Sequence, residues 1–68
     1  MSSYYFYQND AIHALQSAAK AIDSALANSG KPHLFPSAIW ETNFAIRKLS
    51  LAQMKLIQAN SEYKAKDK

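Results

Sequence analysis

The chain contains two histidines and five carboxylates, the side chains that most often act as acids, bases or metal ligands. Neither His13 nor His33 is followed at the third or fourth position by another histidine or a carboxylate, the spacing typical of metal ligands on one face of a helix. Gly30 is the only glycine, which argues against a glycine-rich phosphate loop. No pairing of nucleophile with base, or of acid with base, is indicated. We therefore expect no catalytic residue, no metal site, no cofactor and no enzymatic activity.

Aromatic rings and cations form a second group of side chains with a chemical use. Three tyrosines and a phenylalanine occupy residues 4–7, Lys20 follows, and the second half carries Arg47, Lys48 and Lys55. Rings stack on bases and cations bind phosphates, so this combination suits a nucleotide. A structural interpretation is also open, because tyrosines near a terminus often close a core or an interface, and helical lysines often form a solvated face.

The periodicity of the first half predicts one helix over residues 10–28. Either Asn9 or Asp10 can cap its first amides, while Gly30 suits the left-handed position that ends a helix and Pro32 cannot continue one. Large and small apolar residues recur at spacings of three and four, which places them along one side of the helix. This stripe consists of Ile12, Leu15, Ala19, Ile22 and Leu26.

A second, longer helix is predicted over residues 37–64, after a loop at residues 29–36 and before a basic tail at residues 65–68. Glycine and proline are absent from residue 37 onward, so nothing interrupts this helix. Its heptad-like positions alternate small and large side chains, which permits a partner helix to approach. This predicted seam consists of Ala45, Leu49, Ala52, Leu56, Ala59 and Tyr63.

Another sector of the second helix carries Trp40, Phe44, Leu51 and Met54, more apolar surface than one short neighbouring helix can cover. Either other copies of the chain cover this sector, or the aromatic residues 4–7 fold back across it. We favour the first explanation. The predicted fold is a single all-α domain over residues 1–68, an antiparallel two-helix hairpin with an aromatic N-terminal segment, assembled into a homo-oligomeric helical bundle.

Composition limits the class of protein. A 68-residue chain without cysteine has neither disulfides nor thiolate metal sites to stabilise it, which again favours self-association. Apolar residues make up 49% of the chain, but their runs are too short to span a membrane, and no secretory signal is visible. We expect a soluble, cytoplasmic protein without a membrane partner. The net charge of +3 predicts only weak attraction to nucleic acid, so we expect no nucleic-acid partner.

Residues 44–59, FAIRKLSLAQMKLIQA, resemble the second helix of a phage-borne helical-hairpin family. This family comprises the anti-CBASS cyclic-oligonucleotide sponges and the related hairpin domain of anti-Thoeris proteins. The shared positions are Ala45, Ile46, Lys48, Leu49, Ala52, Met54, Leu56 and Ala59. The family often has a polar residue such as threonine near Arg47 and a tryptophan near Lys55; this chain departs at both, which leaves the ligand open.

The resemblance implies an oligomer that sequesters cyclic oligonucleotide messengers in pockets between protomers, in the cytoplasm of a host cell, and so prevents activation of host defence effectors. It implies that Tyr5 or Tyr7 stacks on a base, that Lys20 lies near a phosphate, and that Arg47 or Lys48 adds charge from a neighbouring protomer. The main alternative is a small adaptor or inhibitor. It would bind a host or phage protein through Trp40, Phe44, Leu51 and Met54.

Overall fold

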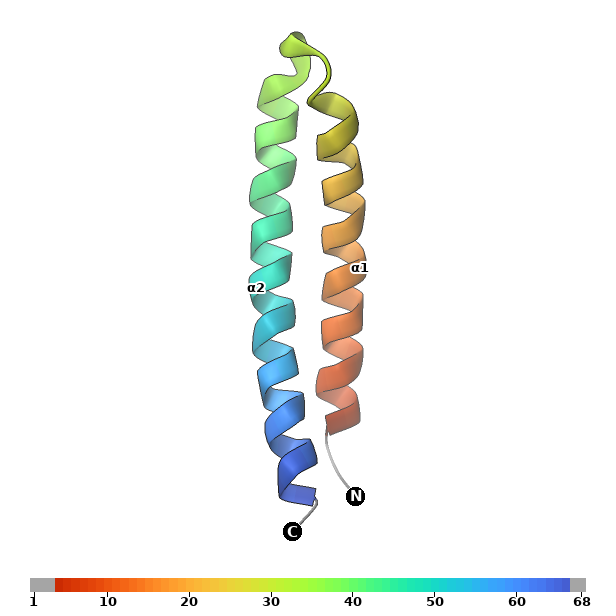
Figure 1. Cartoon of the computed structure of the whole chain (residues 1–68), viewed down its shortest axis with the longest axis vertical. Coiled ribbons are helices and arrows are strands. Elements are labelled where there is room, and N and C mark those ends of the chain that lie inside the picture. The colour runs from red at the N-terminus through yellow and green to blue at the C-terminus, as the bar shows by residue number, and fades with distance from the viewer. Residues whose placement is uncertain (1–3, 67–68) are drawn as a thin grey trace.

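The structure is a computed structural model that describes residues 4–66. Two helices, α1 (Tyr4–Asn28) and α2 (Phe35–Lys66), are joined by a 3-10 turn, η1 (Pro32–Leu34). They lie side by side and antiparallel, with the connection at one end and both termini at the other (Figure 1). The predicted all-α hairpin is therefore confirmed. The first three residues and the last two of the predicted domain, including the end of the basic tail, lie outside the described residues.

Alanine alone forms the buried contact between the helices. Within residues 4–66, the buried hydrophobic residues are nine alanines, and no large side chain is fully buried. On α1 they follow the spacing of three and four that keeps residues on one side of a helix, and on α2 they recur every seven residues. We call this set the alanine seam: Ala11, Ala14, Ala18, Ala21 and Ala25 of α1 with Ala38, Ala45, Ala52 and Ala59 of α2.

The larger residues predicted to form the contact lie beside the alanine seam instead. On α2 the predicted alanines are buried, but Leu49 and Leu56 remain 43% and 46% exposed. On α1 the predicted stripe stays largely outside the contact, with Leu15 41% and Leu26 75% exposed. A methyl group fills less space between two backbones than a leucine side chain, so a contact made through alanines excludes the leucines beside them.

Helix α1 begins six residues earlier than predicted, because the aromatic residues 4–7 are helical. The Tyr4 ring meets the Tyr63 ring edge-on, with 5.6 Å between centroids, and this contact with α2 extends the pairing to the termini. Asn9 and Asp10 consequently lie inside the helix and cap nothing. The aromatic residues do not fold back across the sector of Trp40, which lies near the connection.

The connection is shorter than the predicted loop and ends α1 without a left-handed glycine. No residue in 4–66 has a positive φ, so Gly30 does not use its special freedom. The helix closes instead through Ser29, whose amide and hydroxyl both donate to the Ala25 carbonyl, at 2.9 and 2.6 Å. Across the connection, Asn28 Nδ2 donates to Glu41 Oε1 at 2.9 Å and ties the end of α1 to α2.

The hairpin is a thin rod. Its Cα atoms extend over 55 × 13 × 11 Å, and its radius of gyration is 15.6 Å, against about 11 Å for a compact chain of this length. A rod of two helices has no interior beyond the line where they touch. Both broad sides of the hairpin are therefore surface, and any site must lie on one of them.

Candidate functional site

Two aromatic rings form the centre of the candidate site. Trp40 and Phe44 are one turn apart on α2, so their side chains lie on the same side of the helix. Their rings are stacked, with centroids 6.4 Å apart and an interplanar angle of 16°. Trp40 is 69% exposed and Phe44 37% exposed. A flat, accessible ring of this kind can stack on another planar group, such as a nucleobase.

Two cations of α2 lie beside these rings, and one cation of α1 lines the adjoining hollow. Lys48, one turn after Phe44, places its Nζ 5.4 Å from the Phe44 ring centroid. Arg47 lines a small hollow together with Trp40, Asn43 and Phe44. The α1 residue Lys20 lines the larger hollow on the other side of the same rings. We call the set Lys20, Trp40, Phe44, Arg47 and Lys48 the basic-aromatic patch.

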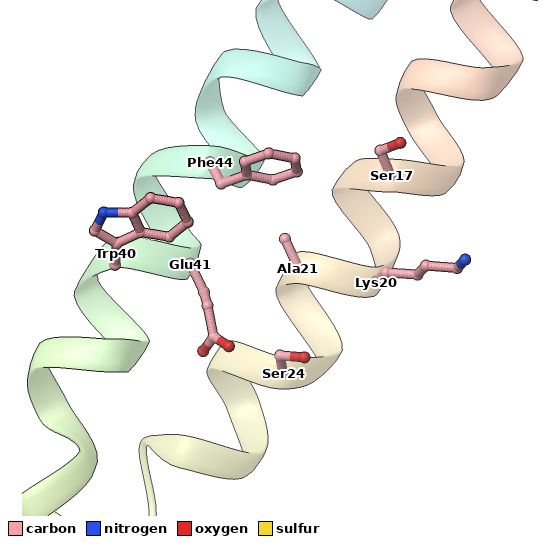
Figure 2. A pocket seen from close by; sticks show the side chains of 7 residues that line it. All are labelled: Ser17, Lys20, Ala21, Ser24, Trp40, Glu41 and Phe44. Carbon is pink, nitrogen blue, oxygen red and sulfur yellow. The ribbon is translucent and has the colours of Figure 1, made fainter.

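The larger hollow has a volume of about 330 Å³, at the small end of the range for ligand pockets. Its walls come from both helices: Ser17, Lys20, Ala21, Ser24, Trp40, Glu41 and Phe44. Figure 2 shows the Phe44 ring extending toward α1 and the Glu41 carboxylate reaching toward Ser24, while the Lys20 ammonium points away from the rings. Lys20 thus lines the hollow with its carbon stem, and its long side chain leaves the charge at the rim.

Glu41 places a negative charge in this hollow, close to where a phosphate would be attracted. Its carboxylate accepts the hydrogen bond from Asn28 Nδ2 at 2.9 Å, so one oxygen is already occupied. Because the cations of the patch lie around Phe44 and Glu41 lies toward the connection, the arrangement favours an anion at the Phe44 end.

A second hollow of about 320 Å³ continues along the same side toward the termini. It shares Ser17 with the first hollow, and Lys48 of the basic-aromatic patch lines it too. Its cation Lys55 is already engaged, at 3.6 Å from the Asp10 carboxylate and 5.6 Å from the Tyr7 ring centroid. The complete lining is Asn9, Asp10, His13, Ala14, Ser17, Lys48, Leu51 and Lys55.

Of the five residues predicted to bind a ligand, Arg47 and Lys48 lie beside the Trp40 and Phe44 rings, whereas Lys20 lines the adjoining hollow with its ammonium pointing away from the rings (Figure 2). The other two, Tyr5 and Tyr7, lie near the start of α1, thirteen or more residues before Lys20, which corresponds to about 20 Å along a helix. Tyr5 stacks on Tyr4 at 4.2 Å between centroids, and Tyr7 contacts Lys55. Within one protomer, these tyrosines are separate from the basic-aromatic patch.

Of the residues predicted as an oligomer or partner interface, Trp40 and Phe44 belong to the basic-aromatic patch. Leu51 lines the second hollow, and Met54 is 56% exposed and lines none of the hollows described here. Sequence reasoning missed Ser17 and Ser24, which line the first hollow from α1. Each directly precedes a buried alanine of α1, which would have placed both beside the contact, but the predicted α1 stripe did not include those alanines.

Among the described residues, one tyrosine near the start of α1 has a clearly perturbed pKa. A hydrogen bond with the Tyr5 side chain is the main cause that raises the pKa of Tyr4 above its ordinary value of 10.0, and desolvation adds to it. The hydroxyl therefore stays protonated at neutral pH. This cluster brings aromatic rings and a hydrogen bond between the Tyr4 and Tyr5 side chains.

No cluster of histidine and acidic side chains within residues 4–66 is suited to hold a metal ion. Neither α1 nor α2 has a stretch long and apolar enough to cross a membrane.

Comparisons of the chain with protein-family models, with curated proteins and with solved structures find no match. The geometry of the basic-aromatic patch and the sequence resemblance are therefore the grounds on which a function is proposed.

Proposed function

We propose that this protein acts by binding rather than by catalysis, and that it sequesters cyclic oligonucleotide second messengers at the basic-aromatic patch. Such a protein would counter host defence by stoichiometric capture, within the cytoplasm of the host cell. The observation that carries the proposal is the set of side chains around Phe44. The exposed Trp40 ring stacks on it and Lys48 lies over it, while Arg47 and Lys20 line the adjoining hollows.

The chemical groups of a cyclic dinucleotide match the side chains of the basic-aromatic patch. A cyclic dinucleotide presents two base faces and two phosphates in one compact molecule. Trp40 offers a face for one base, and Arg47 offers a planar pair of donors for a phosphate, with Lys48 and Lys20 as further cations. One patch accounts for one base and its phosphate, so two patches from different protomers would be needed to enclose a whole ligand.

The tyrosines fit the proposal only through a neighbouring protomer. Tyr5 and Tyr7 lie too far along α1 to reach a ligand held at Phe44 of the same chain. In an assembly, the aromatic end of one hairpin could lie against the patch of another. The likeness of residues 44–59 to the anti-CBASS and anti-Thoeris hairpins supports pockets of this composite kind.

The proposal is tested by thermal unfolding and calorimetric titration of the full chain with a panel of cyclic di- and trinucleotides. We expect the melting temperature to rise for at least one of them, because a ligand that binds the folded state stabilises it. Arg47→Glu should weaken binding about tenfold to a hundredfold, the loss expected for one charge-assisted contact. Lys64→Glu, an equal charge reversal at the other end of α2, is the matched control.

If no cyclic nucleotide binds, the proposed function is wrong. If one binds but Arg47→Glu and Trp40→Ala both leave the affinity unchanged, the function stands and the basic-aromatic patch is not its site.

A second candidate function is that of an adaptor that binds another protein. It is favoured by the exposure of Trp40 and of Met54, two large side chains on α2 that are 69% and 56% exposed. Substitution of Met54 by alanine separates the two candidates, because Met54 does not line the hollow around Phe44. A protein partner lost with Met54→Ala, together with no response to any nucleotide, would favour the adaptor.

A further inference from the structure

The side of the hairpin opposite the basic-aromatic patch is apolar. Successive residues of a helix are rotated by about 100°, so the residues before and after a seam alanine lie on opposite sides of the seam. On α2, Phe44 precedes Ala45 and Ile46 follows it; on α1, Ser17 precedes Ala18 and Ala19 follows it. Large aliphatic residues gather on this second side, and we call six of them, which lie between its two ends, the apolar face: Ile12, Leu15, Ile22, Ile46, Leu49 and Leu56.

The two helices contribute to one continuous surface there. Leu15 of α1 and Ile46, Leu49 and Leu56 of α2 line a single shallow hollow of about 440 Å³, whose remaining lining is Ser50, Ala52 and Gln53. None of these side chains is charged. Every member of the apolar face is between 41% and 60% exposed, which is unusual for six branched aliphatic residues on one side of so small a protein.

The molecule as a whole exposes more surface than a compact protein of its size. Its accessible area is 5273 Å², whereas a folded monomer of 7.6 kDa is expected to expose about 4300 Å². The difference is roughly 1,000 Å². The broad side of the hairpin, 55 Å by 13 Å between Cα atoms, offers about 700 Å², close to the ~800 Å² that each partner contributes to a standard stable interface.

We propose that the apolar face is the interface with a second copy of this chain, so that two hairpins pack face to face into a four-helix bundle. A second copy is the occupant that best fits these observations. It brings a surface of the same length and the same lack of charge, and a two-fold axis lets each apolar face bury the other completely. The branched side chains of one hairpin then pack around the shallow hollow of the other and form the large-residue core that the alanine seam lacks.

This inference does not depend on the proposed function. It places the interface on a different side from Trp40, Phe44, Leu51 and Met54, the residues that the sequence suggested for self-association. The basic-aromatic patches of both protomers then face outward, where a patch can meet the patch of another dimer and enclose a ligand with it.

The test compares two leucines that are two residues apart on α2 and similarly exposed, Leu49 at 43% and Leu51 at 37%. Light scattering and sedimentation equilibrium of the full chain should give a mass of at least twice 7.6 kDa that falls on dilution. Leu49→Glu buries a charge in the proposed interface and should yield a monomer or an unfolded chain. Leu51→Glu places the same charge on the patch side and should leave the dimer intact.

A second measurement tests which side of the hairpin forms the interface and does not place a charge there. The natural sequence has no cysteine, so a single one can be introduced and its reaction with a thiol reagent followed. Gln53→Cys lies at the hollow of the apolar face, and Ser24→Cys lies at the hollow of the basic-aromatic patch. We expect labelling of Gln53→Cys to slow at least tenfold as the protein concentration rises, and that of Ser24→Cys to stay constant.

Two results would overturn the inference. One is a wild-type chain that is folded and monomeric at every concentration, which would leave the apolar face for a different partner. The other is an oligomer in which Leu51→Glu dissociates the subunits, Leu49→Glu does not, and only Ser24→Cys is protected. A failure of nucleotide binding would leave both measurements unaffected.

Discussion

At the scale of single residues, the contact between the helices depends on side chains no larger than a methyl group. Ala18 and Ala52 are each 1% exposed. Each buried methyl contributes only about 0.8 kcal/mol to stability. The contact buries little volume, but it tolerates only small side chains, because any longer side chain at these positions must push the helices apart.

We predict that Ala52→Leu lowers the free energy of unfolding by at least about 1–3 kcal/mol, the usual cost of overpacking a tight contact. Chemical denaturation measures the effect. Ala27→Leu is the control, because Ala27 is exposed and both substitutions replace the same residue in a helix. An equal stability of the two variants would mean that the helices do not meet at Ala52.

The ion pair between Asp10 and Lys55 should matter much less. Its atoms are 3.6 Å apart, but Asp10 is 59% and Lys55 26% exposed, so water screens the attraction. We expect Asp10→Asn to change the free energy of unfolding by less than about 1 kcal/mol. A larger loss in a denaturation experiment at physiological salt would show that Lys55 needs this partner to hold its place beside Tyr7.

At the scale of elements, the connection between the helices does not need the conformational freedom of its glycine. Gly30 has no positive φ, and a Cβ added there would meet only the Ala27 carbonyl oxygen, at 3.8 Å. Replacing it by alanine therefore introduces no strain and reduces the freedom of the unfolded chain. We predict that Gly30→Ala raises the free energy of unfolding by about 0.4–1 kcal/mol. A loss of stability in thermal or chemical unfolding would instead indicate that Gly30 adopts a left-handed conformation.

The connection is also held by the hydrogen bond between Asn28 and Glu41. Glu41→Gln keeps an acceptor oxygen and removes the charge, whereas Glu41→Ala removes the bond. We expect Glu41→Ala to cost about 0.5–1.5 kcal/mol in unfolding experiments and Glu41→Gln to cost less. Since Glu41 is the acid in the hollow beside Trp40, Glu41→Gln should also strengthen anion binding there. Weaker binding would assign Glu41 a direct contact with the ligand.

At the scale of the whole molecule, the two broad sides of the hairpin differ in kind. One side bears the basic-aromatic patch and the other the apolar face, and the alanine seam separates them. This division allows one small chain to assemble through one side and bind through the other. A substitution on the apolar face therefore leaves the side chains of the basic-aromatic patch in place, and the reverse also holds.

The sequence by itself determined the all-helical class, the two helices and their antiparallel pairing. Residues 29–36 contain the signals that interrupt the helix, and the long segment after residue 37 contains none. These features follow from local physics, since helix termination and helix propagation depend on residues close together in the chain. Lys20, Arg47 and Lys48 were proposed as ligand-binding residues from their charge and from what the family resemblance implies, and this role stays a prediction.

Only the tertiary structure decided which residues of each helix meet the other helix. Periodicity predicted a contact through the large stripe of α1, and on α2 through alanines together with Leu49 and Leu56. The alanines form the contact instead, which moves Leu15, Leu49 and Leu56 to the surface and sets Phe44 beside the α1 hollow. The physical reason is that close packing depends on the fit between two surfaces, and one helix's sequence does not describe its partner's surface.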